Sequence, residues 1–129
     1  SDVYRPVCEL LDEIERNTPP SRHPTAFKHP VTGGTVLYLS AGLTYAIERA
    51  DGTLAEDELL QELLEVSGQL DDTFTHEYIH LQTFEEGDLL IWDNRRLVHR
   101  ALHTTTPEPA ASFRVTVHDD YPFYDGIAV

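Results

Sequence analysis

The sequence has few basic residues, a single cysteine and no long apolar run. Nine Lys and Arg stand against 23 Asp and Glu, and the formal net charge of −14 at pH 7 repels nucleic-acid backbones and anionic membranes. The one cysteine, Cys8, cannot form an internal disulfide, and we expect it to be a small buried side chain. Nowhere do eighteen apolar residues run together, and no basic-then-apolar leader is present. We therefore expect a soluble cytoplasmic protein that binds neither nucleic acid nor membrane.

Several motifs of known enzyme classes are also missing. No serine stands in a nucleophile elbow, no glycine-rich loop suits a phosphate group, and no cysteine pair suits zinc. Hydrolase, kinase and zinc-site interpretations therefore have no support. A chain of 129 residues has the length of one domain with its own core, so we expect residues 1–129 to form a single domain.

Two helices are predicted in the first part of the chain. Apolar side chains at helical spacing predict a helix over residues 3–16, with Asp2 as its N-cap. A second helix is predicted to follow Thr53, with Glu56 completing a capping box and Gly68 ending the helix. The segment between the two helices is rich in proline at first, which predicts an irregular loop there.

Strands are predicted mainly in the second half of the chain. Runs rich in β-branched and aromatic residues, bounded by turn-forming residues, are typical of strands. The predicted strands cover residues 35–40, 43–48, 78–84, 88–92, 97–102 and 113–118. Together with the two helices, they indicate an α+β protein that is mainly β.

The last predicted strand has two chemically different faces, because side chains alternate between the two sides of a strand. Its apolar side chains are Phe113, Val115 and Val117, and its polar side chains are Arg114, Thr116 and His118. The simplest interpretation is an ordinary sheet whose polar face lies in water. A functional interpretation needs a further motif nearby.

Such a motif precedes this strand. The sequence IWDNRRLVH covers residues 91–99, and Arg114 follows fifteen residues after His99. Upstream, HPVTGGTVLYLSAGLTYAIE covers residues 29–48. Over roughly residues 20–125, these motifs resemble the iron(II)- and 2-oxoglutarate-dependent dioxygenases of the taurine dioxygenase/TfdA family, whose C-terminal half carries W-D-N-R-x-x-x-H and then an arginine. The resemblance implies a double-stranded β-helix of jelly-roll type with an inserted helix, and this chain would be its C-terminal half.

The resemblance also implies roles for single residues. His99 matches the family's distal iron-binding histidine, and Arg114 matches the arginine that binds the far carboxylate of 2-oxoglutarate. The turn Trp92, Asp93 and Asn94 would place the histidine. A neutral imidazole suits iron(II), and a guanidinium fork binds a carboxylate through two hydrogen bonds. The implied reaction uses O2 to oxidise a small organic substrate, by hydroxylation in the family's usual manner, while 2-oxoglutarate becomes succinate and CO2.

His118 and Thr116 are weaker candidates, for contacts with the substrate. His118 stands where sulfonate-using members of the family have a second arginine that holds the substrate anion. Its presence there argues against a taurine-like substrate and favours a neutral, amine-bearing or weakly anionic one.

The family's other two iron ligands form a His-x-Asp or His-x-Glu motif far upstream. In this chain only His118 has an acid two positions later, Asp120, and a triad of these two with His99 would invert the family's order. The favoured interpretation places the motif on polypeptide outside these 129 residues, either a missing N-terminal half or the complementary chain of a split enzyme. A half barrel exposes the edges of its sheet, so we expect a complementary chain or a second copy of this chain as partner.

Two alternatives stay open. The first is a non-catalytic binding subunit that keeps the fold without a complete metal site; a plain binding jelly roll of the cupin type accounts less well for Arg114. The second concerns His76 and His80, whose spacing suits a metal pair, although a structural role fits their strand-like surroundings better.

Overall fold

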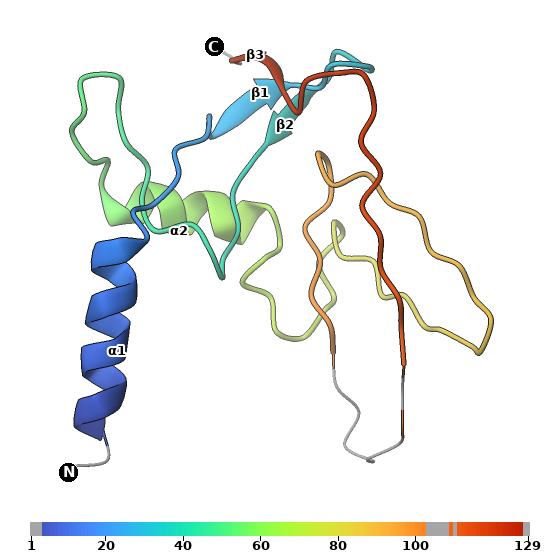
Figure 1. Cartoon of the computed structure of the whole chain (residues 1–129). Coiled ribbons are helices and arrows are strands. Elements are labelled where there is room, and N and C mark those ends of the chain that lie inside the picture. Colours follow the sequence, from blue (N-terminus) through green and yellow to red (C-terminus); the bar gives the residue numbers. More distant parts are fainter. Residues whose placement is uncertain (1–3, 103–108, 110, 128–129) are drawn as a thin grey trace.

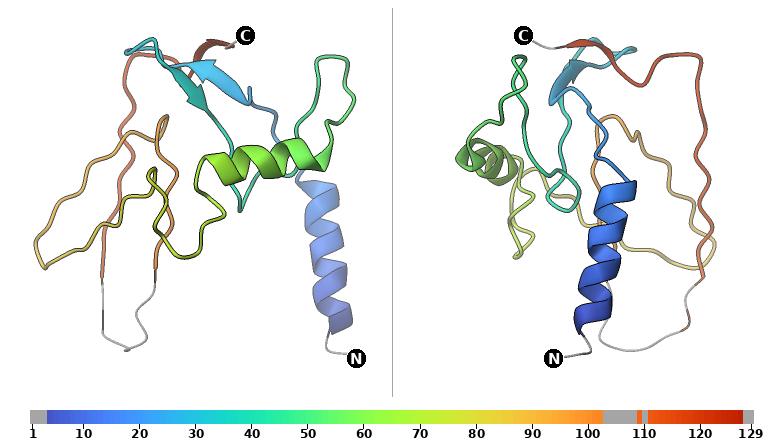
Figure 2. Two further views of the ribbon diagram at one scale, coloured as in Figure 1. Left: turned by 180° about the vertical axis from the view of Figure 1, so that it is seen from behind. Right: turned by 60° about the vertical axis from the view of Figure 1, so that its left-hand side comes forward.

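The structure is a computed structural model, and it describes residues 4–102, 109 and 111–127 (Figure 1). Its helices and strands follow the chain in the order α1 (Tyr4–Asn17), β1 (Ala26–Lys28), β2 (Thr35–Leu37), α2 (Asp57–Val66) and β3 (Asp125–Ile127). The three strands form one small sheet, and most of the second half of the chain runs as long loops beside it (Figures 1 and 2).

The sheet joins the first strand of the chain to its last described segment. Its strand order is β2-β1-β3, and both neighbours of β1 are antiparallel to it. Phe27 pairs with Val36 on one side and with Ile127 on the other, where an irregularity follows at Lys28. The chain that follows the candidate strand at residues 113–118 therefore returns to the first strand of the molecule.

An aromatic cluster packs on this sheet. Phe27 is the largest fully buried side chain, at 0% exposure. Its ring centroid lies 5.6 Å from that of Tyr38, 6.0 Å from that of Phe123 and 5.6 Å from that of Tyr124. Edge-on and tilted ring contacts of this kind add stability beyond the apolar area that they bury. The cluster fixes the segment before β3 against the sheet.

A second apolar cluster anchors α2. Leu60 and Leu64 lie one helical turn apart, so both face the same side, where they pack against Leu39 just after β2. Ile47 and Leu63 cover this cluster partly. The core of the described residues therefore consists of two small groups, one on the sheet and one under α2.

The start of α2 differs from the prediction. The capping box from Thr53 to Glu56 was wrong, because the helix begins at Asp57 and its N-cap Glu56 makes no side-chain capping hydrogen bond. Thr53 instead donates to the Asp51 carboxylate from its backbone N and its hydroxyl, at 2.9 and 2.6 Å. The competing side-chain turn keeps this stretch out of the helix.

The end of α2 confirms the prediction. Gly68 has φ +83°, which favours glycine, and its N–H donates to the carbonyl of Glu65 at 3.0 Å. The N–H of Gln69 donates to the carbonyl of Leu64, also at 3.0 Å. This pair of reversed hydrogen bonds is the Schellman motif, so Gly68 ends the helix as expected.

The first predicted helix is also confirmed, but Cys8 within it is not buried as expected. Helix α1 spans Tyr4–Asn17 and contacts no other helix or strand of the described chain. The right-hand view of Figure 2 shows it apart from the sheet and from α2. Cys8 is exposed, so the prediction of a buried thiol was wrong: helical periodicity identifies a face but not what covers it. The predicted cap Asp2 lies outside the described residues.

The predicted strands are confirmed only in part. Residues 35–37 of the strand predicted over 35–40 form β2, and the strand predicted over 43–48 is reduced to a bridge between Glu48 and Leu54. The other predicted strands show no ladder in the described part of the chain; they cover residues 78–84, 88–92, 97–102 and 113–118. A strand exists only when a neighbour accepts its backbone hydrogen bonds, which alternation alone does not supply. The described residues are α+β, and their two helices and one small sheet neither confirm nor contradict a jelly roll that is mainly β.

No described helix combines the length and apolar character that a membrane crossing requires.

Candidate active site

The candidate site is built on the turn at residues 92–97. The carbonyl of Asp93 accepts from the N–H groups of Arg96 and Leu97, each at 3.1 Å. Its Oδ1 accepts from the N–H of Arg95 at 2.8 Å. A carboxylate that bonds to the backbone two residues on is a common turn former, and here it ends the apolar run at residue 92.

The side chain of Trp92 lies between this turn and His99. Its indole Nε1–H donates to Oδ1 of Asn94 at 2.8 Å. Its ring meets the imidazole of His99 edge-on, with the ring centroids 5.0 Å apart and an interplanar angle of 62°. The resemblance predicts that this turn places His99. The ring of Trp92, which is bonded to the turn and contacts the imidazole, can position His99 physically.

A buried histidine that was not singled out in the sequence holds the turn. His29 is 5% exposed, and its Nδ1 accepts from the N–H groups of Val31 and Thr32 at 3.1 and 3.2 Å. The arrangement suits the neutral ring with its proton on Nε2, which donates to Oδ2 of Asp93 at 2.7 Å. The motif that begins at His29 is thereby joined to the motif that contains Asp93.

The hydrogen bonds decide the charge of Asp93. Partial burial acts to raise the pKa of its carboxyl group, but the N–H of Arg95, the ring of His29 and the nearby Arg95 charge outweigh it. The pKa of Asp93 is therefore below its ordinary value, and the group is a carboxylate at neutral pH. A charged acceptor makes the hydrogen bond from His29 stronger than a neutral pair would.

Arg95 links the turn to the end of the chain. Its guanidinium donates to both oxygens of Asp119 at 3.0 Å, and this pairing holds the pKa of Asp119 below its ordinary value. It also donates to the carbonyls of Phe123 at 2.7 Å and Pro122 at 3.0 Å. With 14% of its side chain exposed, Arg95 is committed to structure and is not free to bind a ligand.

The predicted ligand residues, by contrast, are free. His99 is exposed, and within the described residues neither ring nitrogen has a hydrogen-bond partner, so either nitrogen is available to a metal. Arg114, Thr116 and His118 are likewise exposed and make no hydrogen bond or ion pair to a described side chain. Figure 1 shows the segments that carry His99 and Arg114 running in opposite directions, away from the sheet and back toward it.

The alternative triad within the chain is not formed. The described residues, which include His99, His118 and Asp120, contain no group of three His, Cys, Asp or Glu side chains able to hold a metal ion. The inverted triad was therefore wrong for this structure. Since no described set completes the coordination of His99, a metal there requires ligands from elsewhere.

His76 and His80 each contact a neighbour two positions later in the chain. The Nδ1 of His76 accepts from the N–H of Tyr78 at 3.1 Å, and the Nε2 of His80 contacts the side chain of Gln82 at 3.1 Å. The ring of His76 also lies against Gly68, at the end of α2. These contacts favour the structural role.

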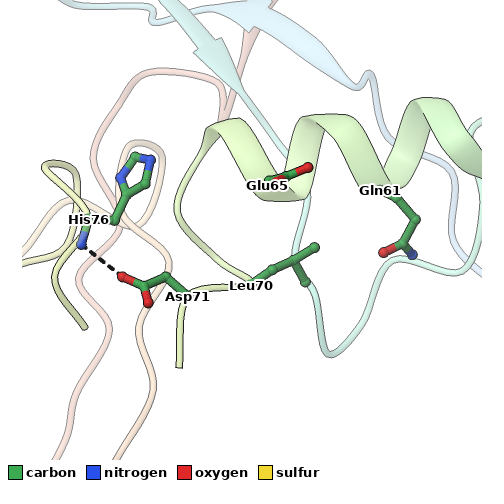
Figure 3. A pocket seen from close by; sticks show the side chains of 5 residues that line it. All are labelled: Gln61, Glu65, Leu70, Asp71 and His76. Atoms are coloured by element: carbon green, nitrogen blue, oxygen red, sulfur yellow. Dashed lines mark hydrogen bonds between the residues drawn. The ribbon is translucent and has the colours of Figure 1, made fainter. Parts of the chain in front are cut away.

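The same histidine lines a pocket beside α2 with Gln61, Glu65, Leu70 and Asp71 (Figure 3). Asp71 is already engaged, because its carboxylate accepts from the hydroxyl of Thr73 at 2.6 Å and from the N–H of His76 at 2.8 Å. These bonds, with that of Thr73 first, hold the pKa of Asp71 far below its ordinary value. Asp71 and Nδ1 of His76 are therefore used in holding the loop, and no group of three metal-binding side chains is found among the described residues.

Comparison with known proteins identifies the family. The family model described as "Taurine catabolism dioxygenase TauD, TfdA family" matches residues 9–116. The chain belongs to the TauD/TfdA family. The resemblance inferred from the WDN motif and Arg114 is thus confirmed, and the family implies a jelly-roll-like fold.

Relatives of the TauD/TfdA chain are named as dioxygenases that depend on alpha-ketoglutarate, which is 2-oxoglutarate. A Schizosaccharomyces pombe protein, whose name proposes a sulfonate dioxygenase, is 28% identical over 106 residues, 80% of this chain and 25% of that protein. A Cupriavidus pinatubonensis 2,4-dichlorophenoxyacetate dioxygenase is 30% identical over 111 residues, 84% of this chain and 35% of that protein. An Emericella nidulans xanthine dioxygenase is 30% identical over 77 residues, 59% of this chain and 20% of that protein. The chain spans between 20% and 35% of the length of these relatives.

The sequence interpretation missed His29, Arg95 and Asp119. A signal was present for two of them, because His29 opens the upstream motif and Arg95 stands inside the WDN motif. Nothing in the local sequence marks Asp119 as a partner of Arg95, since 24 positions separate them.

Proposed function

We propose that this chain is the C-terminal part of a jelly-roll dioxygenase that depends on iron(II) and 2-oxoglutarate and oxidises a small organic substrate. The observation that carries the proposal is His99: it follows the WDN turn, contacts Trp92, and keeps both ring nitrogens free of described partners. The names of the relatives support 2-oxoglutarate as cosubstrate. One atom of O2 enters a substrate C–H bond as hydroxyl, and the other enters succinate as 2-oxoglutarate loses CO2.

The chain supplies two groups to this reaction. His99 offers an imidazole nitrogen, a donor that suits iron(II). Iron(II), when bound, would supply the redox chemistry for the reaction of 2-oxoglutarate with O2. Arg114 holds the far carboxylate of 2-oxoglutarate with its guanidinium fork, which fixes the direction of the molecule as well as binding it.

Substrate contacts are assigned to His118 and Thr116, which alternate with the apolar side chains of the same segment. A histidine there offers a hydrogen bond but lacks the guanidinium fork with which an arginine holds an anion. This favours a neutral, amine-bearing or weakly anionic substrate over a sulfonate.

The remaining metal ligands are proposed to come from polypeptide outside these 129 residues. Apolar side chains in the candidate strand support a covering partner, because Phe113 is 99% exposed and Val115 and Val117 are each 86% exposed. Contiguous apolar surface of this kind is typical of an interface. The occupant is the family's N-terminal half, a complementary chain or a second copy. The single free cysteine fits a cytoplasmic enzyme.

Anaerobic titration of the purified protein with iron(II) and then 2-oxoglutarate tests this function. We expect a weak visible charge-transfer band that is lost in His99→Ala, whereas Arg114→Ala raises the 2-oxoglutarate requirement strongly and keeps iron binding. His80→Ala and Arg96→Ala serve as matched controls, because both side chains are exposed. An unchanged 2-oxoglutarate requirement in Arg114→Ala refutes the assignment of that residue.

The second candidate is a non-catalytic binding subunit. It is favoured by the lack of any group of three metal-binding side chains among the described residues. Intact mass and subunit composition, measured on the same sample, separate the two candidates. A single 129-residue species without the band indicates the binding subunit, and additional polypeptide together with the band indicates the dioxygenase.

A further inference from the structure

Four residues are joined by consecutive hydrogen bonds, and we call this set of His29, Asp93, Arg95 and Asp119 the brace. His29 donates to Oδ2 of Asp93 at 2.7 Å, and the N–H of Arg95 donates to Oδ1 of the same carboxylate at 2.8 Å. The guanidinium of Arg95 then donates to both oxygens of Asp119 at 3.0 Å. The brace connects the turn between β1 and β2 with the chain on either side of the candidate site.

The brace joins the two segments that carry the candidate ligand residues. Arg95 lies between Asp93 and His99, while Asp119 directly follows the segment of Arg114. Figure 1 shows both segments extending away from the sheet from this point. No backbone ladder joins them in the part of the chain that the structure describes, so their relative position depends on side chains.

The geometry at Arg95 requires an arginine. Its donors reach the two carboxylate oxygens of Asp119 and the carbonyls of Pro122 and Phe123 at the same time. Its guanidinium carbon also lies 5.6 Å from the ring centroid of Phe123. A lysine keeps the charge but lacks the planar fork, so it cannot hold the direction of Asp119. The neighbouring Arg96 is exposed and makes none of these side-chain contacts.

We propose that Arg95 and Asp119 are positioning residues that set the segment of Arg114 relative to that of His99. The inference rests on the proposed function, in which His99 binds iron and Arg114 binds the far end of 2-oxoglutarate. One molecule of 2-oxoglutarate must reach both Arg114 and the iron that His99 holds. A shift of one segment against the other therefore weakens 2-oxoglutarate binding. Iron affinity changes little, because the brace makes no contact with a ring nitrogen of His99.

The test compares Arg95→Lys with Arg96→Lys in the purified protein. We expect Arg95→Lys to weaken 2-oxoglutarate binding in the anaerobic titration by about tenfold, with iron(II) affinity unchanged. Asp119→Asn is the second variant, and it tests the same contact from an exposed partner. Since the two residues act as one pair, the double variant binds no more weakly than the weaker single variant. The proposal is overturned if Arg95→Lys and Arg96→Lys bind 2-oxoglutarate equally well. It is also overturned if the losses of affinity in the two single variants multiply in the double variant.

Hydrogen exchange without iron tests the brace separately from the catalytic assignment. In Arg95→Lys and in Asp119→Asn, backbone amides at both 93–99 and 119–124 exchange faster than in Arg96→Lys. Faster exchange at only one of the two segments overturns the brace. An unchanged 2-oxoglutarate affinity in Arg114→Ala counts instead against the proposed function. In that case the hydrogen-exchange result alone tests whether the brace holds the two segments together.

Discussion

Nε2 of His29 and Oδ2 of Asp93 lie 2.7 Å apart, although 64 positions separate the two residues in the sequence. The contact closes the turn after β1 onto the turn before His99. Nδ1 of the His29 ring also accepts hydrogen bonds from the N–H groups of Val31 and Thr32. One buried side chain thus satisfies three polar groups that come from two distant parts of the chain.

Replacing His29 by alanine removes all three hydrogen bonds at once. The three partners are only partly buried and regain some hydration, but the substitution also leaves a void at the buried ring, so we expect a loss of about 2–3 kcal/mol in the free energy of unfolding. Denaturant unfolding measures it. His80→Ala, at an exposed histidine, is the control and should change stability little. Equal effects of the two substitutions would contradict the structural role of His29.

Gly68 cannot be replaced by alanine without strain. Its φ of +83° disfavours a side chain, and an added Cβ would lie 2.7 Å from Nδ1 and 2.8 Å from Cγ of His76. We expect Gly68→Ala to lower the unfolding free energy by about 2 kcal/mol or more.

Gly52→Ala is the matched control, since Gly52 has φ +85° and no atom within 4 Å of the added Cβ. Only the backbone cost of about 1 kcal/mol then applies. The difference between the two variants measures the contact with His76. It should shrink when both are made in a His76→Ala background, because alanine removes the ring but keeps a Cβ 3.3 Å from the added atom.

The pairing of Asp119 with Arg95 makes stability depend on acid pH. Hydrogen bonds from Arg95 hold the pKa of Asp119 below its ordinary value. The carboxylate therefore stabilises the fold above its unfolded pKa of about 3.9, and this contribution is lost as the pH falls through the lower folded pKa. Asp119→Asn should reduce the melting temperature at pH 7, and the difference from the unchanged protein should shrink below about pH 4.

Asp120→Asn is the control for this acid titration, because its exposed carboxylate makes no hydrogen bond or ion pair to a described residue. Its effect on the melting temperature should be the smaller of the two at pH 7. A pH-independent difference for Asp119→Asn would contradict the ion pair.

Leu64 tests the cluster under α2. It is 4% exposed and packs with Leu39 and Leu60, so Leu64→Ala leaves a cavity and should cost about 2–4 kcal/mol. Leu59→Ala, on the 38% exposed neighbour of the same helix, should cost less. Denaturant unfolding of both variants measures the difference. Equal losses of stability would contradict the burial of Leu64 in this cluster.

The family and the candidate residues follow from short stretches of sequence. The W-D-N-R-x-x-x-H motif and the later Arg114 were sufficient to indicate the TauD/TfdA family, which the match over residues 9–116 confirms. The reason is that metal and carboxylate chemistry restricts residue type at each position. The roles of His99 and Arg114 remain predictions.

Local structure followed from sequence where neighbours in the chain determine it. Helical spacing of apolar residues located α1 and most of α2, and Gly68 marked the helix end because its reversed hydrogen bonds are local. The start of α2 was misplaced, because the Asp51 side chain competes for Thr53.

The sequence by itself determined the family, the two helices and the residues offered for chemistry. Only the tertiary structure decided that His29 meets Asp93, that Arg95 meets Asp119, and that Cys8 is exposed. It also decided which extended segments pair into a sheet. The physical reason is distance along the chain: contacts between remote segments depend on how the whole chain closes, and no local pattern of residue types encodes that closure.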